Sequence, residues 1–314
     1  MYIGIDLGGT NIAAGVINSE GKLLITDSIP TRNERDSKEI INDMIQLVET
    51  LIRNSGFKRT EFKAIGIGIP GIADDNTGNV VYCVNLNWEN ISLKEPMETS
   101  LQIPVFIGND ATVAGVAEYG IGKMKNYKNG IFLTLGTGVG SGVIIDGKAF
   151  TGSHGIGTEI GHMVVGDNFY DCNCGRNGCL ETFASATALI KYTEKELNAG
   201  RKSTLQESIK TSKLDARMIF DAAKNGDELA LESVDRLVKY LAIGISNLIN
   251  IIDPEIFLLG GGVSKAGDFL LDKIRLEVEN NKSFRKIDSG IIQLAELEND
   301  AGIIGAAMLG KISL

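Results

Sequence analysis

The chain has 314 residues, a formal net charge of −9 and a pI near 5.0, with 43% hydrophobic and 23% charged residues. This composition is typical of a soluble globular protein and excludes a largely disordered or fibrous chain. The acidic balance excludes a nucleic-acid partner, because such proteins need a concentrated basic surface. At this length two domains with a cleft between them are expected.

Targeting and membrane signals are not found. The start, MYIGIDLGGT, lacks a basic stretch followed by an apolar run, so no secretory signal is expected and a cytoplasmic location is predicted. The most apolar region, Leu241 to Val263, is interrupted by polar residues that a bilayer core would not tolerate. It predicts a buried helix followed by a buried strand, and no membrane partner.

The first third of the chain alternates strand and helix patterns. Residues 2 to 28 predict three antiparallel strands joined by glycine-containing turns. The apolar spacing from Ser37 to Asn54 predicts a helix with one buried face. The run AIGIGIPG predicts a buried strand, and Pro104 to Ile107 predicts a short strand that leads into a helix from Ala111 to Tyr119.

A later segment, IFLTLGTGVGSGVII, repeats the opening segment at a constant offset of 127 positions. Gly9 and Thr10 match Gly136 and Thr137, for example. Such self-similarity predicts two lobes built on one plan, each with a strand, a glycine turn and a second strand. Together with the helical stretches after Asp215, this pattern predicts the α/β class.

Three glycine clusters could border a phosphate, because backbone N–H groups can approach its oxygens closely where no Cβ intervenes. They contain Gly8, Gly9 and Thr10; Gly136, Thr137 and Gly138; and Gly260, Gly261 and Gly262. Asp6 could hold Mg²⁺ through its water shell. Each cluster alone could instead be an ordinary tight turn. Neither a Walker sequence nor a Rossmann fingerprint is present, which argues against P-loop enzymes and dehydrogenases.

Phosphoryl transfer also needs a base for the attacking hydroxyl, and Asp110 at the end of a predicted strand is suitably placed. Asp110 could alternatively be only the N-cap of the helix that follows. A sugar needs paired donors and acceptors around its hydroxyls. Asn109, Asp110, Glu159 and Glu181 are candidates for this role, although a lone glutamate is more often simply solvated.

A metal site is indicated by His162, Cys172, Cys174 and Cys179, which form the ligand set of a closed tetrahedral zinc site. Four protein ligands leave no position for water, so a structural zinc ion that orders the loop and positions Glu181 is expected. The alternative is three free thiols and a buried histidine.

These segments together resemble the ROK family of sugar kinases and repressors, and its glucokinase-like enzymes in particular, over essentially the whole chain. The matching segments are IGIDLGGTN, GIPG, IGNDA, LGTGVGSG, GSHGIGTEIGH, CNCGRNGCLE and LLGGGVS. The resemblance implies a two-lobed actin-like ATPase fold of the ribonuclease H-like type. The lobes are expected at residues 1–115 and 116–299, with a C-terminal helix at about 300–314 that packs back on the first lobe.

The resemblance also implies roles for single residues. Asp110 would be the general base; Asn109, Glu159, His162 and Glu181 would contact sugar hydroxyls; and His162 would bind zinc with the three cysteines. The residues bordering ATP and its Mg²⁺ would be Asp6, Gly8, Gly9, Thr10, Asn11, Gly136, Thr137, Gly138, Gly260, Gly261 and Gly262.

The implied activity is ATP-dependent phosphorylation of a hexose in carbohydrate metabolism, such as the glycolytic conversion of glucose to glucose 6-phosphate, by a homodimer or homotetramer. N-acetylmannosamine, N-acetylglucosamine, fructose and allose remain alternative substrates, and a non-catalytic sugar sensor remains an alternative from another class. Repressors of the family carry a DNA-binding segment ahead of the first glycine loop. Asp6 stands almost at the start of this sequence, so an enzyme is expected.

Overall fold

The computed structural model describes residues 1–75, 77–153, 155–284, 286–297 and 301–314, and its chain divides into two compact units. Unit 1 comprises Met1–Lys128, Gly142–Thr158 and Glu296–Leu314, and unit 2 comprises Asn129–Ser141 and Glu159–Ala295. Within the described residues, no helix combines the length and the apolar character needed to span a membrane.

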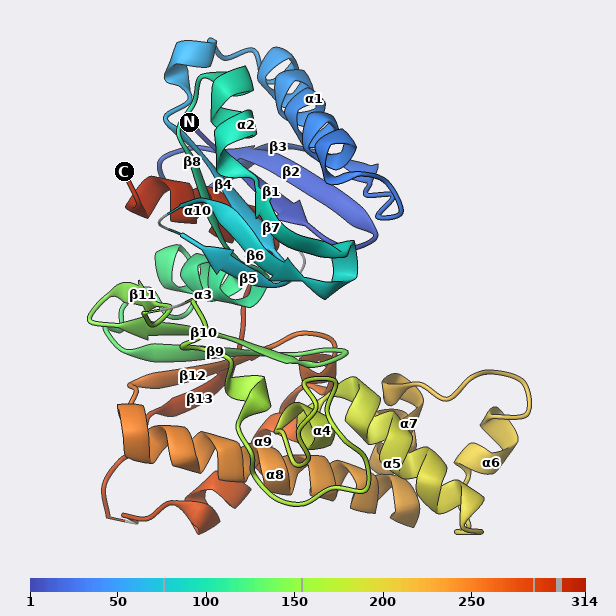
Figure 1. The fold of residues 1–314 in the computed structure, drawn as a ribbon. Coiled ribbons are helices and arrows are strands. Elements are labelled where there is room, and N and C mark those ends of the chain that lie inside the picture. Colours follow the sequence, from blue (N-terminus) through green and yellow to red (C-terminus); the bar gives the residue numbers. More distant parts are fainter. Residues whose placement is uncertain (76, 154, 285, 298–300) are drawn as a thin grey trace. The chain divides into compact units, whose positions relative to one another are not determined.

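A five-stranded sheet is the centre of unit 1 (Figure 1). Its strands follow the order β3 (Leu23–Pro30), β2 (Asn11–Ile17), β1 (Tyr2–Leu7), β4 (Ala64–Ile69) and β8 (Val105–Asn109). The first three strands form the antiparallel opening that the sequence predicts, whereas β1, β4 and β8 run parallel. The carboxyl ends of the parallel strands therefore meet at one edge of the sheet.

Besides this sheet, the described residues of unit 1 form four helices, two short 3-10 helices, a small antiparallel sheet and two strand segments, residues 142–145 and Lys148–Phe150, that belong to the second sheet described below. The helices are α1 (Ser37–Ser55), α2 (Lys94–Leu101), α3 (Asp110–Gly120) and α10 (Ala301–Ile312), with 3-10 turns at Arg59–Glu61 and Val84–Leu86. The small sheet contains β5 (Ile72–Asp74), β6 (Asn79–Cys83) and β7 (Trp88–Ser92). The predicted boundaries of α1 are confirmed: a capping box of Asp36 and Glu39 begins the helix, and Gly56 in the left-handed region ends it.

Helix α10 lies directly on the backbone of β1 and β4 (Figure 1). The isoleucines of these strands face the core that also contains α1, and the alternating glycines face α10. A Cβ at Gly4 would lie 1.8 Å from the carbonyl oxygen of Ile303, and one at Gly66 would lie 1.7 Å from that of Ala306. Only glycine fits at these two positions.

A second five-stranded sheet has the order β11 (Lys148–Phe150), β10 (Val139–Ile145), β9 (Gly130–Leu135), β12 (Ile256–Gly260) and β13 (Ile291–Leu294). Strands β10 and β11 pair antiparallel, whereas β12 runs parallel to both β9 and β13. This is the strand order of the first sheet, repeated element by element. The internal repeat and the α/β class predicted from the sequence are therefore confirmed.

The helices of unit 2 pack on one another. They are α4 (Glu181–Ala184), α5 (Ala186–Asn198), α6 (Leu205–Ser208), α7 (Ala216–Lys224), α8 (Glu228–Ile252) and α9 (Asp268–Asn281), with 3-10 turns at Ile160–His162 and Val263–Ala266. The apolar region from Leu241 forms the buried end of α8 and then strand β12, as predicted.

The compact units do not divide at the boundary expected near residue 115. That position lies inside α3, and all of α3 belongs to unit 1 because α10 packs along it. The chain leaves unit 1 after Lys128, returns for Gly142–Thr158 and returns again at Glu296.

We predict that Gly66→Ala destabilises the protein strongly, because the new methyl group would meet the backbone of α10, which cannot move aside as a side chain can. The cost is expected to be about 3 kcal/mol or more, lowering the thermal midpoint by roughly 5 °C or more. Gly262→Ala is the matched control, since Gly262 has a φ of -62°, which alanine adopts without strain, and a Cβ added there would meet nothing within 4 Å. Equal midpoints for the two variants would contradict the close packing of α10.

Candidate active site

The carboxyl edge of the unit 1 sheet brings two aspartates into one region. Asp6 on β1 is in register with Gly68 on β4, which is in register with Gly108 on β8. Asp110 follows two residues later, as the first residue of α3. Both carboxylates therefore lie at the edge where ligands of open α/β sheets bind.

Asn109, and not Asp110, is the N-cap of α3. The side-chain oxygen of Asn109 accepts hydrogen bonds from the backbone N–H groups of Ala111 at 2.9 Å and Thr112 at 3.2 Å. Its amide nitrogen donates to the carbonyl oxygen of Gly71 at 3.0 Å. The capping role considered for Asp110 belongs to its neighbour, and the side chain of Asp110 is exposed at the first turn of the helix.

The first glycine loop joins β1 to β2 and is held by Thr31, a residue that no sequence pattern singles out. The fully buried Thr31 donates from its hydroxyl to the carbonyl oxygen of Gly8 at 2.7 Å and from its backbone N–H to that of Thr10 at 3.0 Å. Gly8 itself donates to the carbonyl oxygen of Asn11 at 2.9 Å. The side chains of Thr10 and Asn11 remain exposed.

Two further contacts at this edge join residues distant in sequence. A Cβ at Gly9 would lie 3.1 Å from that of Asn85, and a Cβ at Gly302 would lie 2.4 Å from Oδ2 of Asp6. The start of α10 thus covers the Asp6 carboxylate, and burial raises the pKa of Asp6 above its ordinary value. No local pattern in the sequence could reveal these contacts, because the partners are separated by tens to hundreds of residues.

The two glycine clusters of unit 2 lie at one edge of the second sheet. Gly260 at the end of β12 is in register with Thr134 near the end of β9, so the loops that follow both strands start side by side. Gly261 has a φ of 82°, and a Cβ on it would lie 2.6 Å from the carbonyl oxygen of Leu135. Glycine is required there both by conformation and by space.

Glu181 lies against the second glycine loop. A Cβ at Gly138 would be 2.7 Å from Oε2 of Glu181, and the thiol of Cys172 donates to Oε1 of Glu181 at 2.9 Å. Glu159 approaches from a different segment, with Oε2 located 3.9 Å from Nε2 of His162. Unit 2 therefore brings together the two glutamates and the histidine that were expected to contact a sugar.

His162 and the three cysteines expected to bind metal form one cluster, with their ligand atoms within 4.8 Å of one another. A tetrahedral zinc ion with Zn–S near 2.3 Å would place sulfur atoms about 3.8 Å apart, and a sulfur and a nitrogen about 3.6 Å apart. The distances are 3.5 Å between the sulfurs of Cys174 and Cys179 and 3.5 Å between Cys172 Sγ and His162 Nδ1. The four side chains thus fit a zinc ion in both donor type and spacing.

The two ring nitrogens of His162 face different partners. Nδ1 is directed at the cysteine cluster, whereas Nε2 faces the Glu159 carboxylate. One histidine can therefore bind a metal through one nitrogen and donate a hydrogen bond through the other, as metal-bound imidazoles commonly do.

The cysteines differ in acidity. A hydrogen bond from the backbone N–H of Arg176 lowers the pKa of the exposed Cys174 to about 6. Burial instead raises the pKa of Cys172 and of Cys179 above the ordinary thiol value. All four cysteines of the chain, Cys83 included, are free of disulfides.

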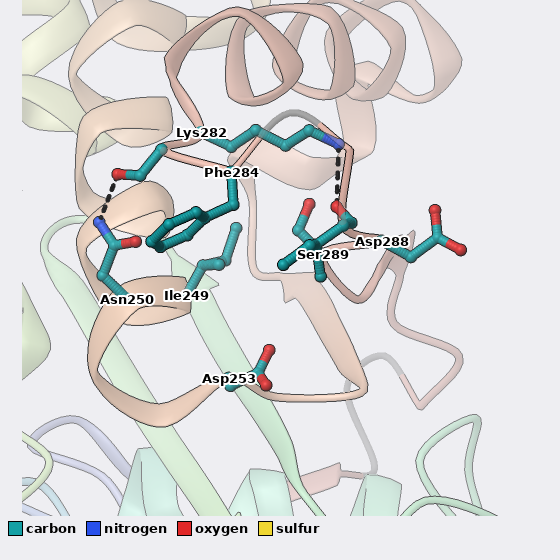
Figure 2. Close-up of a pocket in the computed structure, with 9 residues that line it drawn as sticks. Ile249, Asn250, Asp253, Lys282, Phe284, Asp288 and Ser289 are labelled. Carbon is teal, nitrogen blue, oxygen red and sulfur yellow. Dashed lines mark hydrogen bonds between the residues drawn. The ribbon is translucent and has the colours of Figure 1, made fainter.

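A separate pocket lies at the end of α8 and in the segment after α9 (Figure 2). Asn250 donates to Ser283 at 3.1 Å on one side of it, and Lys282 donates to the carbonyl oxygen of Ile287 at 3.3 Å on the other. Its volume is about 220 Å³, which is below the roughly 300–1,000 Å³ of ordinary small-molecule sites. None of the predicted site residues lines it.

Comparisons with known proteins show similarity over the full length of the chain. A glucokinase of Halalkalibacterium halodurans is 35% identical over 312 residues, which cover 99% of this chain and 94% of that protein. The crystal structure of a ROK family glucokinase from Streptomyces griseus, in complex with glucose and AMPPNP, has a TM-score of 0.81 and 33% identity, covering 99% of both chains. A ROK hexokinase from Thermus thermophilus has a TM-score of 0.85 and 29% identity, covering 99% of this chain and 98% of its own.

These neighbours have the two-lobed actin-like ATPase fold. The matching strand orders of the two five-stranded sheets in this chain agree with that fold. The family model described as ROK family matches residues 2–312, almost the entire sequence. The chain therefore belongs to the ROK family.

Proposed function

We propose that this protein is an ATP-dependent hexose kinase that transfers the terminal phosphoryl group of ATP to glucose, giving glucose 6-phosphate and ADP. The observation that carries the proposal is the arrangement at the start of α3. Asn109 accepts hydrogen bonds from the backbone N–H groups at the start of the helix. Asp110 presents an exposed carboxylate at the sheet edge where Asp6 and the first glycine loop also lie.

In this proposal Asp110 accepts the proton of the attacking sugar hydroxyl as the oxygen forms its bond to phosphorus. Asn109, Glu159, His162 and Glu181 hold the sugar hydroxyls, for which carboxylates and amides are suitable partners. The three glycine loops, with Thr10, Asn11 and Thr137, border the ATP phosphates and the nucleoside. Asp6 would hold the Mg²⁺ that accompanies ATP, and that ion would supply positive charge to offset the charge of the transferred group.

Glucose is favoured as the substrate by the relatives that resemble the chain over their full length. The Halalkalibacterium halodurans and Thermotoga maritima relatives are glucokinases, each 35% identical to this chain. Kinases for N-acetylmannosamine, N-acetylglucosamine, fructose or allose have weaker support. A non-catalytic sugar sensor is disfavoured because Asp6 and Asp110 are both retained at the sheet edge.

We further propose that the cluster of His162, Cys172, Cys174 and Cys179 holds a structural zinc ion. Such an ion would crosslink the loop through these four side chains. The protein side chains then place Glu181 against Gly138, where it contacts the sugar. A cytoplasmic location in carbohydrate metabolism, through glycolysis, and a homodimeric or homotetrameric assembly also belong to the proposal.

We predict that Asp110→Asn lowers kcat by about 10² to 10⁴, because the amide cannot accept the proton, while glucose still binds. ADP release is measured with ATP and Mg²⁺ on glucose, fructose, mannose, allose, N-acetylglucosamine and N-acetylmannosamine, and glucose binding is measured by calorimetry. Asp27→Asn, an exposed position on β3, is the control and should retain full activity. Turnover by Asp110→Asn close to that of the wild type would rule out Asp110 as the base. Sugar binding by the wild type without ADP release would favour the sensor.

The raised pKa of Asp6 predicts a pH-dependent gain of stability in Asp6→Asn. Because burial penalises the ionised carboxylate, the folded protein keeps this proton to higher pH than the unfolded chain does. The contribution of Asp6 to the free energy of unfolding therefore falls as pH rises through the usual carboxyl range near 4 and on to the raised pKa. Asp6→Asn should melt above the wild type at pH 7 without nucleotide, and this difference should shrink toward about pH 4. A variant that melts below the wild type at pH 7 would show that the carboxylate is stabilised in the fold.

We predict about one zinc ion per chain, lost together with thermal stability in Cys174→Ser, since metal binding and ordering of the loop are coupled. Metal content is measured by atomic emission and the melting temperature with and without a chelator. Cys83→Ala, which alters the cysteine outside the cluster, should keep its metal. Wild-type protein that loses its metal at unchanged melting temperature would contradict a structural role.

A further inference from the structure

Arg236 on α8 occupies the centre of an aromatic cluster beside the cysteine loop. Its guanidinium carbon lies 4.7 Å from the ring centroids of both Phe183 and Tyr192. The same carbon lies 5.4 Å from the ring centroid of Tyr240 and 5.8 Å from that of Phe169. A planar guanidinium can stack flat on such rings and donate a directed hydrogen bond at the same time, whereas a lysine ammonium offers only a point charge to the rings.

The guanidinium also makes one directed hydrogen bond. Nη2 of Arg236 donates to the side-chain oxygen of Asn168 at 2.7 Å. Burial lowers the pKa of Arg236, but a guanidinium keeps its charge in proteins, so this bond is charge-assisted.

Asn168 connects Arg236 to both ends of the cysteine loop. Its side-chain amide donates to the carbonyl oxygen of Thr182 at 2.7 Å, directly after Glu181. Its backbone N–H donates to the side chain of Asn177 at 2.8 Å, and the Asn177 amide donates back to the carbonyl oxygen of Asn168 at 3.0 Å. Asn168 and Asn177, which flank the segment with Cys172 and Cys174, thus join its two ends by hydrogen bonds.

A second connection between Arg236 and Glu181 runs through Phe183, two residues after Glu181. Phe183 is fully buried, stacks on Tyr240 at 3.8 Å between centroids, and lies against Arg236. Helices α4 and α5 both pack on α8 in this region (Figure 1). Glu181 is thus followed by one residue tied to Arg236 through Asn168 and by another stacked on Arg236 directly.

We propose that Arg236 is a positioning residue that fixes the Glu181 carboxylate against the second glycine loop through Asn168 and Phe183, in addition to the direct contact of Cys172 with Glu181. This inference rests on the proposed function, which assigns Glu181 to the sugar. Arg236 itself does not touch substrate. Its loss should therefore weaken glucose binding and leave ATP binding unchanged.

The experiment compares Arg236→Met and Arg236→Lys with the control Arg217→Met, which removes a guanidinium that is 90% exposed on α7. Steady-state kinetics give KM for glucose, KM for ATP and kcat, while calorimetry gives the Kd for glucose and emission spectroscopy gives the zinc content. Arg236→Met should raise KM and Kd for glucose by about tenfold, the effect of losing one charge-assisted hydrogen bond. KM for ATP and the zinc content should stay at the wild-type level. KM and Kd for glucose should be nearly as high in Arg236→Lys as in Arg236→Met.

Asn168→Ala provides the second arm. If both residues act through one connection, the double variant raises KM for glucose no further than the larger single effect. Unchanged KM and Kd for glucose, with kcat reduced only in proportion to the folded fraction, would show a purely structural role and overturn the inference. Loss of zinc from Arg236→Met would also overturn it.

The parallel binding measurement separates this inference from the proposed function. A wild-type protein that binds glucose without phosphorylating it refutes the kinase, and the Kd values of the variants then still decide the role of Arg236. A wild-type protein that neither binds nor phosphorylates glucose overturns both.

Discussion

Parallel strand pairing is the constraint on which the proposed chemistry depends. Parallel strands end at a common edge, and in both sheets the residues proposed to bind substrate lie there. The first sheet places Asp6 on β1, the first glycine loop after β1 and Asp110 after β8, and the second sheet places its glycine clusters after β9 and β12. The edge of unit 1 is further fixed by α10, which approaches the glycine face of β1 and β4 and covers Asp6 at Gly302. The same close packing that excludes a Cβ at Gly66 therefore also sets the environment of a proposed Mg²⁺-binding carboxylate.

Unit 2 holds the residues that are proposed to contact the sugar in a different way, because they come from irregular segments and short helical turns. Two independent supports act on them. The cysteine cluster joins His162 to the loop that ends at Glu181, and the aromatic cluster around Arg236 joins the neck of that loop to α8. An irregular segment without such supports would not keep a carboxylate in a fixed position, since few backbone hydrogen bonds would oppose its conformational entropy.

The sequence predicted those features that have a local signature. The glycine turns, helix α1 with its one buried face, the repeated strand–turn–strand unit and the cysteine spacing are all readable from neighbouring residues, and the structure contains each of them. The N-cap of α3 could not be assigned, because Asn109 and Asp110 are both good capping residues and only geometry decides between them. Thr31, Asn85, Gly302 and Arg236 were missed because each acts on partners distant in sequence. The boundary between the units also depends on contacts between distant residues, since α3 joins unit 1 through its packing with α10.

The most direct test of the central claim is a crystal structure of Asp110→Asn with glucose and AMPPNP bound. The account predicts the glucose 6-hydroxyl within about 3 Å of the side chain at position 110, as a base requires. It also predicts Glu159, His162 and Glu181 on the remaining hydroxyls and the glycine loops around the phosphates. Glucose bound elsewhere, or bound with its 6-hydroxyl directed away from position 110, would contradict it.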